Sequence, residues 1–227
     1  MKVKKGDFVE LDFIGRIKES NQIFDLTDEE TAKKEKLHQA GAKYRPITIC
    51  IGEGDVVEGL DEELVNKEVG KDYTIEISPE KGFGKKDAKL IKIVNTNMFT
   101  KQNIHPMPGL QVNIDNMMAI IRTVSGGRTV IDFNHPCAGK HVVYEIKILK
   151  KVFDDKEKVE SIFRFHLGMD NPELELHEGT LHINSDVNEM FHEQLNEKIK
   201  KQVPLVKKIQ YKKKEEKKED KKEEKKE

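Results

Sequence analysis

The sequence predicts an α+β protein with three folded parts and a charged tail. Residues 6–17 and 141–152 alternate apolar and polar side chains, which is typical of strands with one buried face. Between them, residues 87–136 contain short strand-like runs and a Gly-Gly hairpin. Residues 154–211 then alternate helical and strand-like patterns, so a third unit is expected after the second alternating run.

Length and charge narrow the function classes. The chain has 227 residues, with 41 Lys plus Arg against 42 Asp plus Glu and a formal net charge of −1. This length allows two or three small domains. Because a nearly neutral chain exerts little long-range attraction on polyanions, we expect no nucleic-acid partner and no binding to an anionic membrane surface.

Cysteine usage and hydropathy point to a reducing, aqueous compartment. Cys50 and Cys137 lie far apart and form no Cys-x-x-Cys motif, so neither a disulfide framework nor a zinc knuckle is indicated. No segment approaches the roughly 18 apolar residues of a membrane span, and the first residues lack a signal-peptide pattern. We therefore expect a cytoplasmic location.

The first alternating run is followed by a predicted surface helix. Thr27 and Glu30 form a capping-box pattern and Gly41 supplies a stop, so the helix is predicted over 27–41. Few of its residues are apolar, which places it on the surface.

Residues 45–78 predict a strand, a short helix and another strand. Isoleucines alternate over 47–51, and apolar residues at helical spacing follow them: Val56, Val57, Leu60 and Leu64. Asp55, with Glu58 three residues later, is the expected N-cap of this helix. Residues 73–77 alternate again as the second strand.

A loop with an aromatic residue separates this region from the hairpin-rich segment. PEKGFGKK, residues 79–86, places Phe83 between two glycines. Strands are then predicted at 90–95, 110–115 and 117–124, with a hairpin over 125–133 that bends at Gly126 and Gly127.

The C-terminal region predicts a small α/β unit. Helices are expected over 157–168 and 187–202, and strands over 173–179, 180–185 and 205–211. Its own core is expected to contain Ile162, Phe163, Phe165, Leu167, Phe191, Leu195 and Ile199. Because so short a unit has an incomplete core, we expect homodimerisation through it. Every residue of 212–227 is charged, so a disordered tail is expected there.

Five motifs in order resemble the FKBP family of peptidyl-prolyl cis-trans isomerases. They are GDFVELDFIGRI, then FD at 24–25, RPITICIGEGDVVEGLDEEL, EKGFG and NHPCAGKHVVYEIKIL. The resemblance extends to about residue 152 and is closest to the long archaeal and bacterial type, in which a chaperone domain is inserted in the flap. It implies an antiparallel half-barrel sheet around a short helix, formed by 1–86 and 137–153, with the insert at 87–136 and a C-terminal α/β domain at 154–211.

The resemblance implies an isomerase site without a cofactor or a metal. Amide resonance gives the Xaa–Pro bond a rotation barrier of about 18–20 kcal/mol, and an apolar pocket that fits the twisted bond lowers it. The implied catalytic residues are Phe13, Asp25, Val57, Phe83 and Tyr144. The implied substrate-binding residues are Phe24, Ile47, Val56 and Leu60. Taken singly, several of these residues are of the types that usually fill a protein core. Only their order in the family pattern favours a site.

Methionines in the insert suggest a surface that accepts many sequences. The predicted client-binding residues are Met98, Phe99, Met117, Met118 and Ile120. Neighbouring strand residues point to opposite faces, so at least one of Met117 and Met118 is expected outside a core. The alternative is that these side chains form the core of the insert. Clients are expected to be unfolded or nascent proline-containing polypeptides, and the alternative function is a holdase or protein-binding module with little isomerase activity.

His135, Cys137 and His141 have donor atoms that bind metals, but their spacing matches no recognised metal motif and Pro and Gly interrupt them. We therefore interpret 134–139 as the turn by which the chain leaves the insert and returns to the first sheet.

Overall fold

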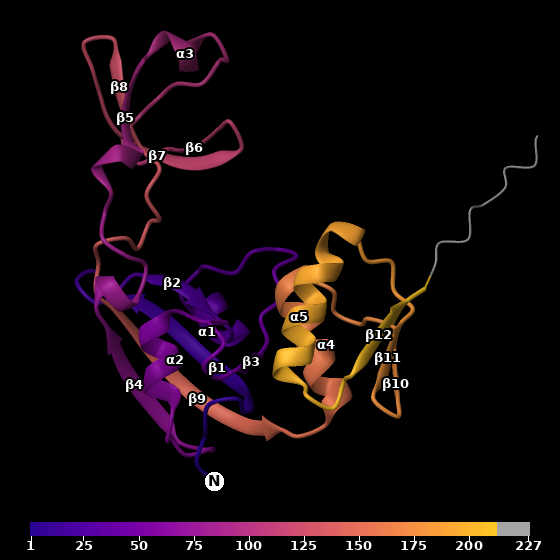
Figure 1. Ribbon diagram of the computed structural model, residues 1–227. Helices are drawn as coiled ribbons and strands as arrows, with labels where there is room; N and C mark the ends of the chain where they lie inside the picture. The colour runs from indigo at the N-terminus through magenta and orange to yellow at the C-terminus, as the bar shows by residue number, and fades with distance from the viewer. Residues whose placement is uncertain (213–227) are drawn as a thin grey trace, which may run out of the picture.

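The computed structural model describes residues 1–212 and contains three separate sheets (Figure 1). The first sheet comprises β1 (Phe8–Ile17), β2 (Ile23–Leu26), β3 (Ile47–Cys50), β4 (Asp72–Ile77) and β9 (Val142–Val152). The second comprises β5 (Ile91–Asn95), β6 (Gln111–Ile114), β7 (Met117–Ser125) and β8 (Arg128–Asp132). The third comprises β10 (Leu174–His177), β11 (Thr180–Ile183) and β12 (Lys208–Tyr211). The helices are α1 (Glu29–Lys34), α2 (Glu58–Leu64), α3 (Asn97–Thr100), α4 (Asp155–Leu167) and α5 (His192–Gln202).

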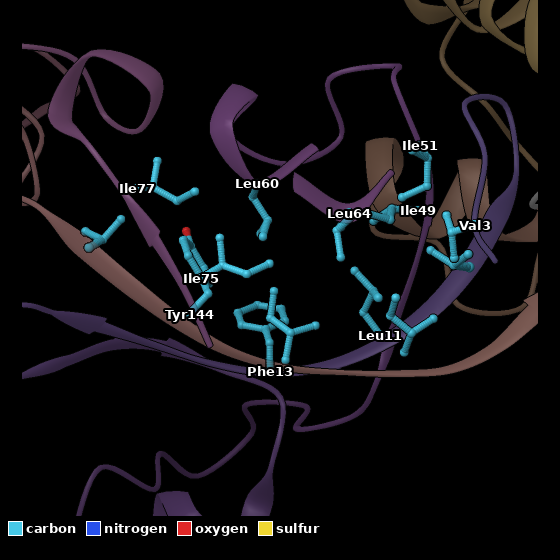
Figure 2. Packing of buried hydrophobic residues seen from close by; sticks show 14 of the residues in the cluster. Val3, Leu11, Phe13, Ile49, Ile51, Leu60, Leu64, Ile75, Ile77 and Tyr144 are labelled. Carbon is cyan, nitrogen blue, oxygen red and sulfur yellow. The ribbon is translucent and has the colours of Figure 1, made fainter. Parts of the chain in front are cut away.

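The first sheet is antiparallel and curves around α2, which confirms the predicted α+β fold with a half-barrel sheet (Figure 1). Strands β1 and β9 pair over their full length and lie at its centre, with Phe13 opposite Ile146. Figure 2 shows Leu60 and Leu64 pointing from α2 into the side chains of this sheet, among them Leu11 and Phe13. These side chains are buried, so the alternation in the sequence marks the face that packs against the helix.

The capping box predicted at Thr27 is wrong. Helix α1 begins at Glu29, and its N-cap is Asp28, whose carboxylate accepts the Thr31 N–H at 2.7 Å. The Thr27 hydroxyl instead accepts the Phe13 N–H at 2.8 Å, so this side chain serves β1 rather than the helix. The helix also ends well before Gly41, because Lys36 adopts a left-handed backbone with φ of 57°.

The prediction that Asp55 is the N-cap of α2 is wrong. The N-cap is Val57, which makes no side-chain capping bond. The Asp55 carboxylate accepts the Cys50 N–H at 2.9 Å and so closes the loop between β3 and α2. This loop, residues 51–57, is called the β3–α2 loop below.

The second sheet projects away from the other two on a pair of chain segments (Figure 1). Gly126 and Gly127 form the predicted hairpin bend, both with positive φ. At the base, Asn134 accepts the Asp87 N–H at 2.8 Å and donates to the Asp87 carbonyl at 3.0 Å. The segments that enter and leave the sheet are therefore tied to each other.

The third sheet packs against α4 and α5, and its core includes residues of the first sheet. Phe8, Cys50 and Val152 from β1, β3 and β9 lie in one cluster with Phe163 of α4. Two residues predicted for this core are not in it: Phe165 is 40% exposed and Phe191 is 45% exposed. The second helix begins at His192, not at 187, because Asn188 caps a separate short turn at Glu189–Phe191.

The tail predicted at 212–227 lies outside the described residues except for Lys212. Across residues 1–212, no helix has both the length and the apolar composition that crossing a membrane requires. The predicted domain limits stay a prediction, for which limited proteolysis is the direct test.

Candidate active site

Four aromatic rings form a cluster on the concave side of the first sheet. Phe13 and Tyr144 have ring centroids 5.9 Å apart, and Phe24 lies 5.6 Å from Tyr144 and 5.4 Å from Phe83. All three pairs meet edge to face, which is a favoured geometry for aromatic rings. We call Phe13, Phe24, Phe83 and Tyr144 the ring cluster.

The rings come from separate parts of the chain that the sheet brings together. Phe13 lies on β1, Phe24 on β2 and Tyr144 on β9, while Phe83 lies on the loop after β4. Gly15 makes room for one of them, since a Cβ at this position would lie 2.7 Å from Cζ of Phe24. The pairing of Gly15 with Asp25 and with Tyr144 on its two sides fixes this register.

Helix α2 supplies the second wall. Leu60 is buried against the same core as Phe13 and Tyr144, while Val56, Val57 and Ile47 are partly buried beside it. Val57 is the N-cap, and its N–H donates no hydrogen bond within residues 1–212. The structure therefore brings all nine predicted site residues to one region, and the Val57 N–H is among the unpartnered backbone donors at the start of the helix.

Asp25 is the acidic residue of this region. The residue as a whole is exposed at the edge strand β2, but desolvation of its carboxyl raises its pKa, and a hydrogen bond with the Leu26 backbone opposes that effect. Its charge also raises the pKa of Tyr144, although desolvation has the larger effect on that hydroxyl. A carboxyl that acts on Tyr144 in this way lies beside the ring cluster.

The Tyr144 hydroxyl is a second free donor. None of the hydrogen bonds within residues 1–212 uses it. Figure 2 shows this oxygen pointing away from β9 on the side of the sheet that carries α2. Its raised pKa keeps the group protonated at neutral pH, so it can donate to an acceptor that enters from this side.

Comparison with known proteins assigns this arrangement to a family. A family model described as FKBP-type peptidyl-prolyl cis-trans isomerase matches residues 1–100, and a model described as FKBP26, IF domain, matches residues 92–137. The short-type peptidyl-prolyl cis-trans isomerase of Methanocaldococcus jannaschii is 34% identical over 146 residues, which are 64% of this chain and 92% of that protein. The chain belongs to the family of FKBP-type peptidyl-prolyl cis-trans isomerases.

Bacterial members of the family match at lower identity. The FKBP-type 16 kDa peptidyl-prolyl cis-trans isomerase of Escherichia coli is 26% identical, over 47% of this chain and 74% of that protein. The probable FKBP-type 16 kDa enzyme of Pseudomonas fluorescens is 28% identical, over 46% and 71%. This FKBP-type isomerase therefore acts on proline-containing polypeptides, as the family does.

His135 packs against the ring cluster, although the sequence suggested only a turn or a metal ligand. Its ring lies parallel to Phe83, with centroids 4.3 Å apart and an interplanar angle of 2°. The Cys137 N–H donates to His135 Nδ1 at 3.2 Å, and desolvation lowers the pKa of the imidazole. The neutral ring thus extends the ring cluster, and no pattern in the sequence predicts its contact with Phe83.

The thiols of Cys50 and Cys137 are buried and unpaired with each other. Burial raises the pKa of Cys50 to about 12, with further increases from Asp55 and Glu53. Burial also raises the pKa of Cys137. Since the thiolate is the reactive form, both side chains behave as small apolar groups in the FKBP-type fold. Within residues 1–212 no group of three or more His, Cys, Asp or Glu side chains is placed to hold a metal ion.

The insert exposes most of its predicted client-binding residues. Met98 is 36% exposed, Met117 is 50% exposed and Met118 is 60% exposed. Both Met117 and Met118 are exposed because they follow the tight turn at Asp115–Asn116, where β7 begins at the end of the sheet. Ile120 is half-buried.

Phe99 is a wrong prediction as a client contact. It is 2% exposed and lies in the core of the second sheet with Val112 and Ile121. The sequence could not separate Phe99 from Met98, because the single turn of α3 buries only one of two neighbours. Two exposed residues that were not predicted, Ile93 and Met107, are 67% and 58% exposed.

Proposed function

We propose that the Xaa–Pro bond rotates against the ring cluster and that the second sheet holds the unfolded chain in which this bond lies. The single observation that carries the first part is the ring cluster, in which Phe13 and Phe24 contact Tyr144 and Phe83 contacts Phe24, beside the unpartnered Val57 N–H and Tyr144 hydroxyl.

The ring cluster and Leu60 bind the proline ring. Rotation requires loss of amide resonance, and the planar amide is more charge-separated than the twisted one. Apolar walls that remove water from the bond therefore favour the twisted state, and complementarity to that state lowers the barrier further. The reaction forms no covalent bond with the protein, in keeping with the protonated thiols of Cys50 and Cys137.

The polar groups orient the substrate carbonyls. Val57 N–H binds a carbonyl of the peptide at the start of α2, where the backbone donors lack partners within the helix. Tyr144 donates from the opposite wall, and Asp25 acts on the rotating carbonyl from the edge strand. Ile47 and Val56 complete the apolar rim.

The test is the isomerisation rate of a short proline peptide. Tyr144→Phe removes only the hydroxyl, and since one hydrogen bond contributes about 0.5–1.5 kcal/mol, kcat/KM should fall about two- to tenfold. Tyr73→Phe is the matched control: Tyr73 lies on β4 of the same sheet, and its hydroxyl accepts the Glu68 N–H at 2.7 Å outside the ring cluster. Equal rates for Tyr144→Phe and the unchanged protein would exclude the hydroxyl from the site.

The holding function rests on the exposed apolar side chains of the second sheet. Met98, Met117 and Met118 are flexible side chains that adapt to many sequences, and Ile93 lies exposed on the edge strand β5. A client held there has a high effective concentration over the ring cluster. The match of residues 92–137 to the FKBP26 IF model supports this role.

Self-association through the C-terminal unit stays a prediction. Met190, Phe191 and Phe165 are 84%, 45% and 40% exposed on this unit and support it. Light scattering on the full chain tests it: a single-chain mass at micromolar concentration contradicts dimerisation.

A further inference from the structure

The β3–α2 loop is held from outside by helix α5 of the C-terminal unit. The Asp55 side chain is only 6% exposed, and both of its carboxylate oxygens are engaged. One accepts the Cys50 N–H at 2.9 Å, and the other lies 3.0 Å from Nζ of Lys198 on α5. Asp55 and Lys198 are far apart in the sequence, so only the docking of the C-terminal unit brings them together.

Two further contacts reach the same loop. Lys201 lies about one turn after Lys198 on α5, and its Nζ is 2.6 Å from Oε2 of Glu53. His166 of α4 places Nε2 at 3.6 Å from the Asp55 oxygen that faces Lys198. Both helices of the C-terminal unit therefore contact the loop, and Lys198 makes the shorter of the two contacts with Asp55.

The β3–α2 loop ends at Val57, whose N–H is the proposed donor to the substrate carbonyl. Asp55 is two residues before Val57, the N-cap of α2. From the other side, Asp61 of α2 accepts the Gly52 N–H at 2.6 Å and the Gly54 N–H at 3.1 Å. The path of the backbone at Val57 is thus set by two carboxylates, one anchored in α2 and one anchored by Lys198.

We propose that Lys198 is a positioning residue for the isomerase: by holding Asp55 it orients the Val57 N–H, so that the C-terminal unit shapes the pocket of a different domain. This inference rests on the proposed role of the Val57 N–H in binding a substrate carbonyl.

The physical reason is the burial of Asp55. A buried carboxylate that loses its cation is strongly destabilised and turns toward water when it can. If Asp55 turns away, the Cys50 N–H loses its acceptor and the loop before Val57 is released. Polar groups in a site must be held to within about 0.5 Å of the productive geometry, so a released loop weakens substrate binding.

The experiment measures kcat and KM on a short proline peptide with the full chain. Lys198→Met should raise KM about three- to tenfold and change kcat less than about twofold, because the N–H binds the carbonyl before and during rotation. Lys198→Arg keeps the cation and should restore KM. The matched control is Lys200→Met, which removes the same charge from an exposed position on the same helix.

A merely structural role of Lys198 gives a different result. Loss of folded protein lowers the apparent kcat and leaves KM unchanged, so that outcome overturns the proposal. The double variant Lys198→Met with Asp55→Asn tests whether Lys198 acts through Asp55. If it does, the KM of the double variant should be no higher than that of the more affected single variant. If the two increases in KM multiply instead, Lys198 does not act through Asp55. If Lys198→Met has no effect but Tyr144→Phe lowers kcat/KM, the positioning role fails and the pocket stands. If neither variant changes the kinetics, the pocket assignment itself is wrong.

Discussion

The imidazole of His135 lies flat against the ring of Phe83, with centroids 4.3 Å apart. Phe83 is on the loop after β4, and His135 is on the segment that returns from the second sheet to the first. The exit of the insert thus contacts one wall of the ring cluster.

Loss of this contact should weaken catalysis. An aromatic pair contributes about 0.5–1.5 kcal/mol beyond the area it buries, so His135→Ala should lower kcat/KM on a short peptide about two- to tenfold. His135→Phe keeps a flat ring and should retain most of the activity. Peptide assays on both variants give the comparison, and an unchanged rate for His135→Ala contradicts a supporting role.

Replacement of Asp25 by Asn should raise the stability of the fold and lower the isomerase activity. Desolvation raises the pKa of Asp25, so the folded state disfavours its charged form. Stability is therefore lost as pH rises from the pKa of the unfolded state, about 3.8, to the higher pKa of the folded state. Above that interval Asp25→Asn removes this cost. At pH 7 we expect a higher Tm with a lower kcat/KM.

Thermal unfolding of Asp25→Asn and the unchanged protein at pH 7 and near pH 4 checks this sign. The gain in Tm should shrink at the lower pH, because Asp25 then becomes protonated in the unchanged protein too. A gain that does not depend on pH excludes desolvation of Asp25 as its cause.

The base of the second sheet should be sensitive to acid. Asp132 is 1% exposed and accepts hydrogen bonds from Arg122 at 2.7 Å and from the Asn134 side chain at 2.8 Å. Burial alone raises the pKa of Asp132, but the bonds from Asn134 and Arg122 outweigh it and hold the pKa below its ordinary value. This stabilisation is therefore present above about pH 4 and is lost as pH falls through the lowered value.

The variant Asp132→Asn should remove the same stabilisation at neutral pH. The Arg122 side chain is 41% exposed, so losing this pair should cost about 1.5–3 kcal/mol, the range for a hydrogen bond to a charged group. Amide protection in β7 and β8 should therefore fall while that in β1 and β9 is retained. Hydrogen exchange on the full chain measures both at once. Arg128→Gln, on β8 and in no ion pair within residues 1–212, is the matched charge control.

Client holding should depend on the exposed methionines of β7. Met117→Ser with Met118→Ser removes apolar surface without changing the buried Ala119 and Ile121. We expect suppression of aggregation, and catalysis of a slow-refolding protein, to fall about tenfold, because the effective concentration of client over the pocket is lost. Peptide turnover should change less than about twofold.

Met190→Ser controls for the loss of an exposed methionine, since Met190 is 84% exposed on the C-terminal unit. It should leave both refolding and peptide rates unchanged. Parallel losses in the two assays for the β7 variant contradict a separate holding surface.

The strands and their buried faces could be predicted from the sequence alone. The alternation through Val9, Leu11 and Phe13 marks a face because side chains of a strand point to opposite sides by turns. The hairpin at Gly126 and Gly127 could be predicted because few other residues tolerate its backbone angles. The order of motifs around Phe13, Asp25, Val57, Phe83 and Tyr144 was enough to indicate the family.

Predictions of which group a side chain binds were incomplete. Thr27 and Asp55 both have the side chain of an N-cap, yet each is used by a neighbouring strand instead. Local sequence patterns indicate which groups a side chain can bind, but not which of these groups lies next to it in the folded protein. Phe99 and Met98 likewise look alike as apolar neighbours, and only the packing of the second sheet decides that Phe99 is buried.

The sequence by itself thus determined the strands of the first sheet, the hairpin at Gly126 and Gly127 and, through the order of its motifs, the family, because backbone angles and side-chain alternation are local properties. Only the tertiary structure decided that His135 supports Phe83 and that Lys198 holds Asp55. Both contacts join residues that are far apart in the sequence, and no periodicity along the chain records such distances.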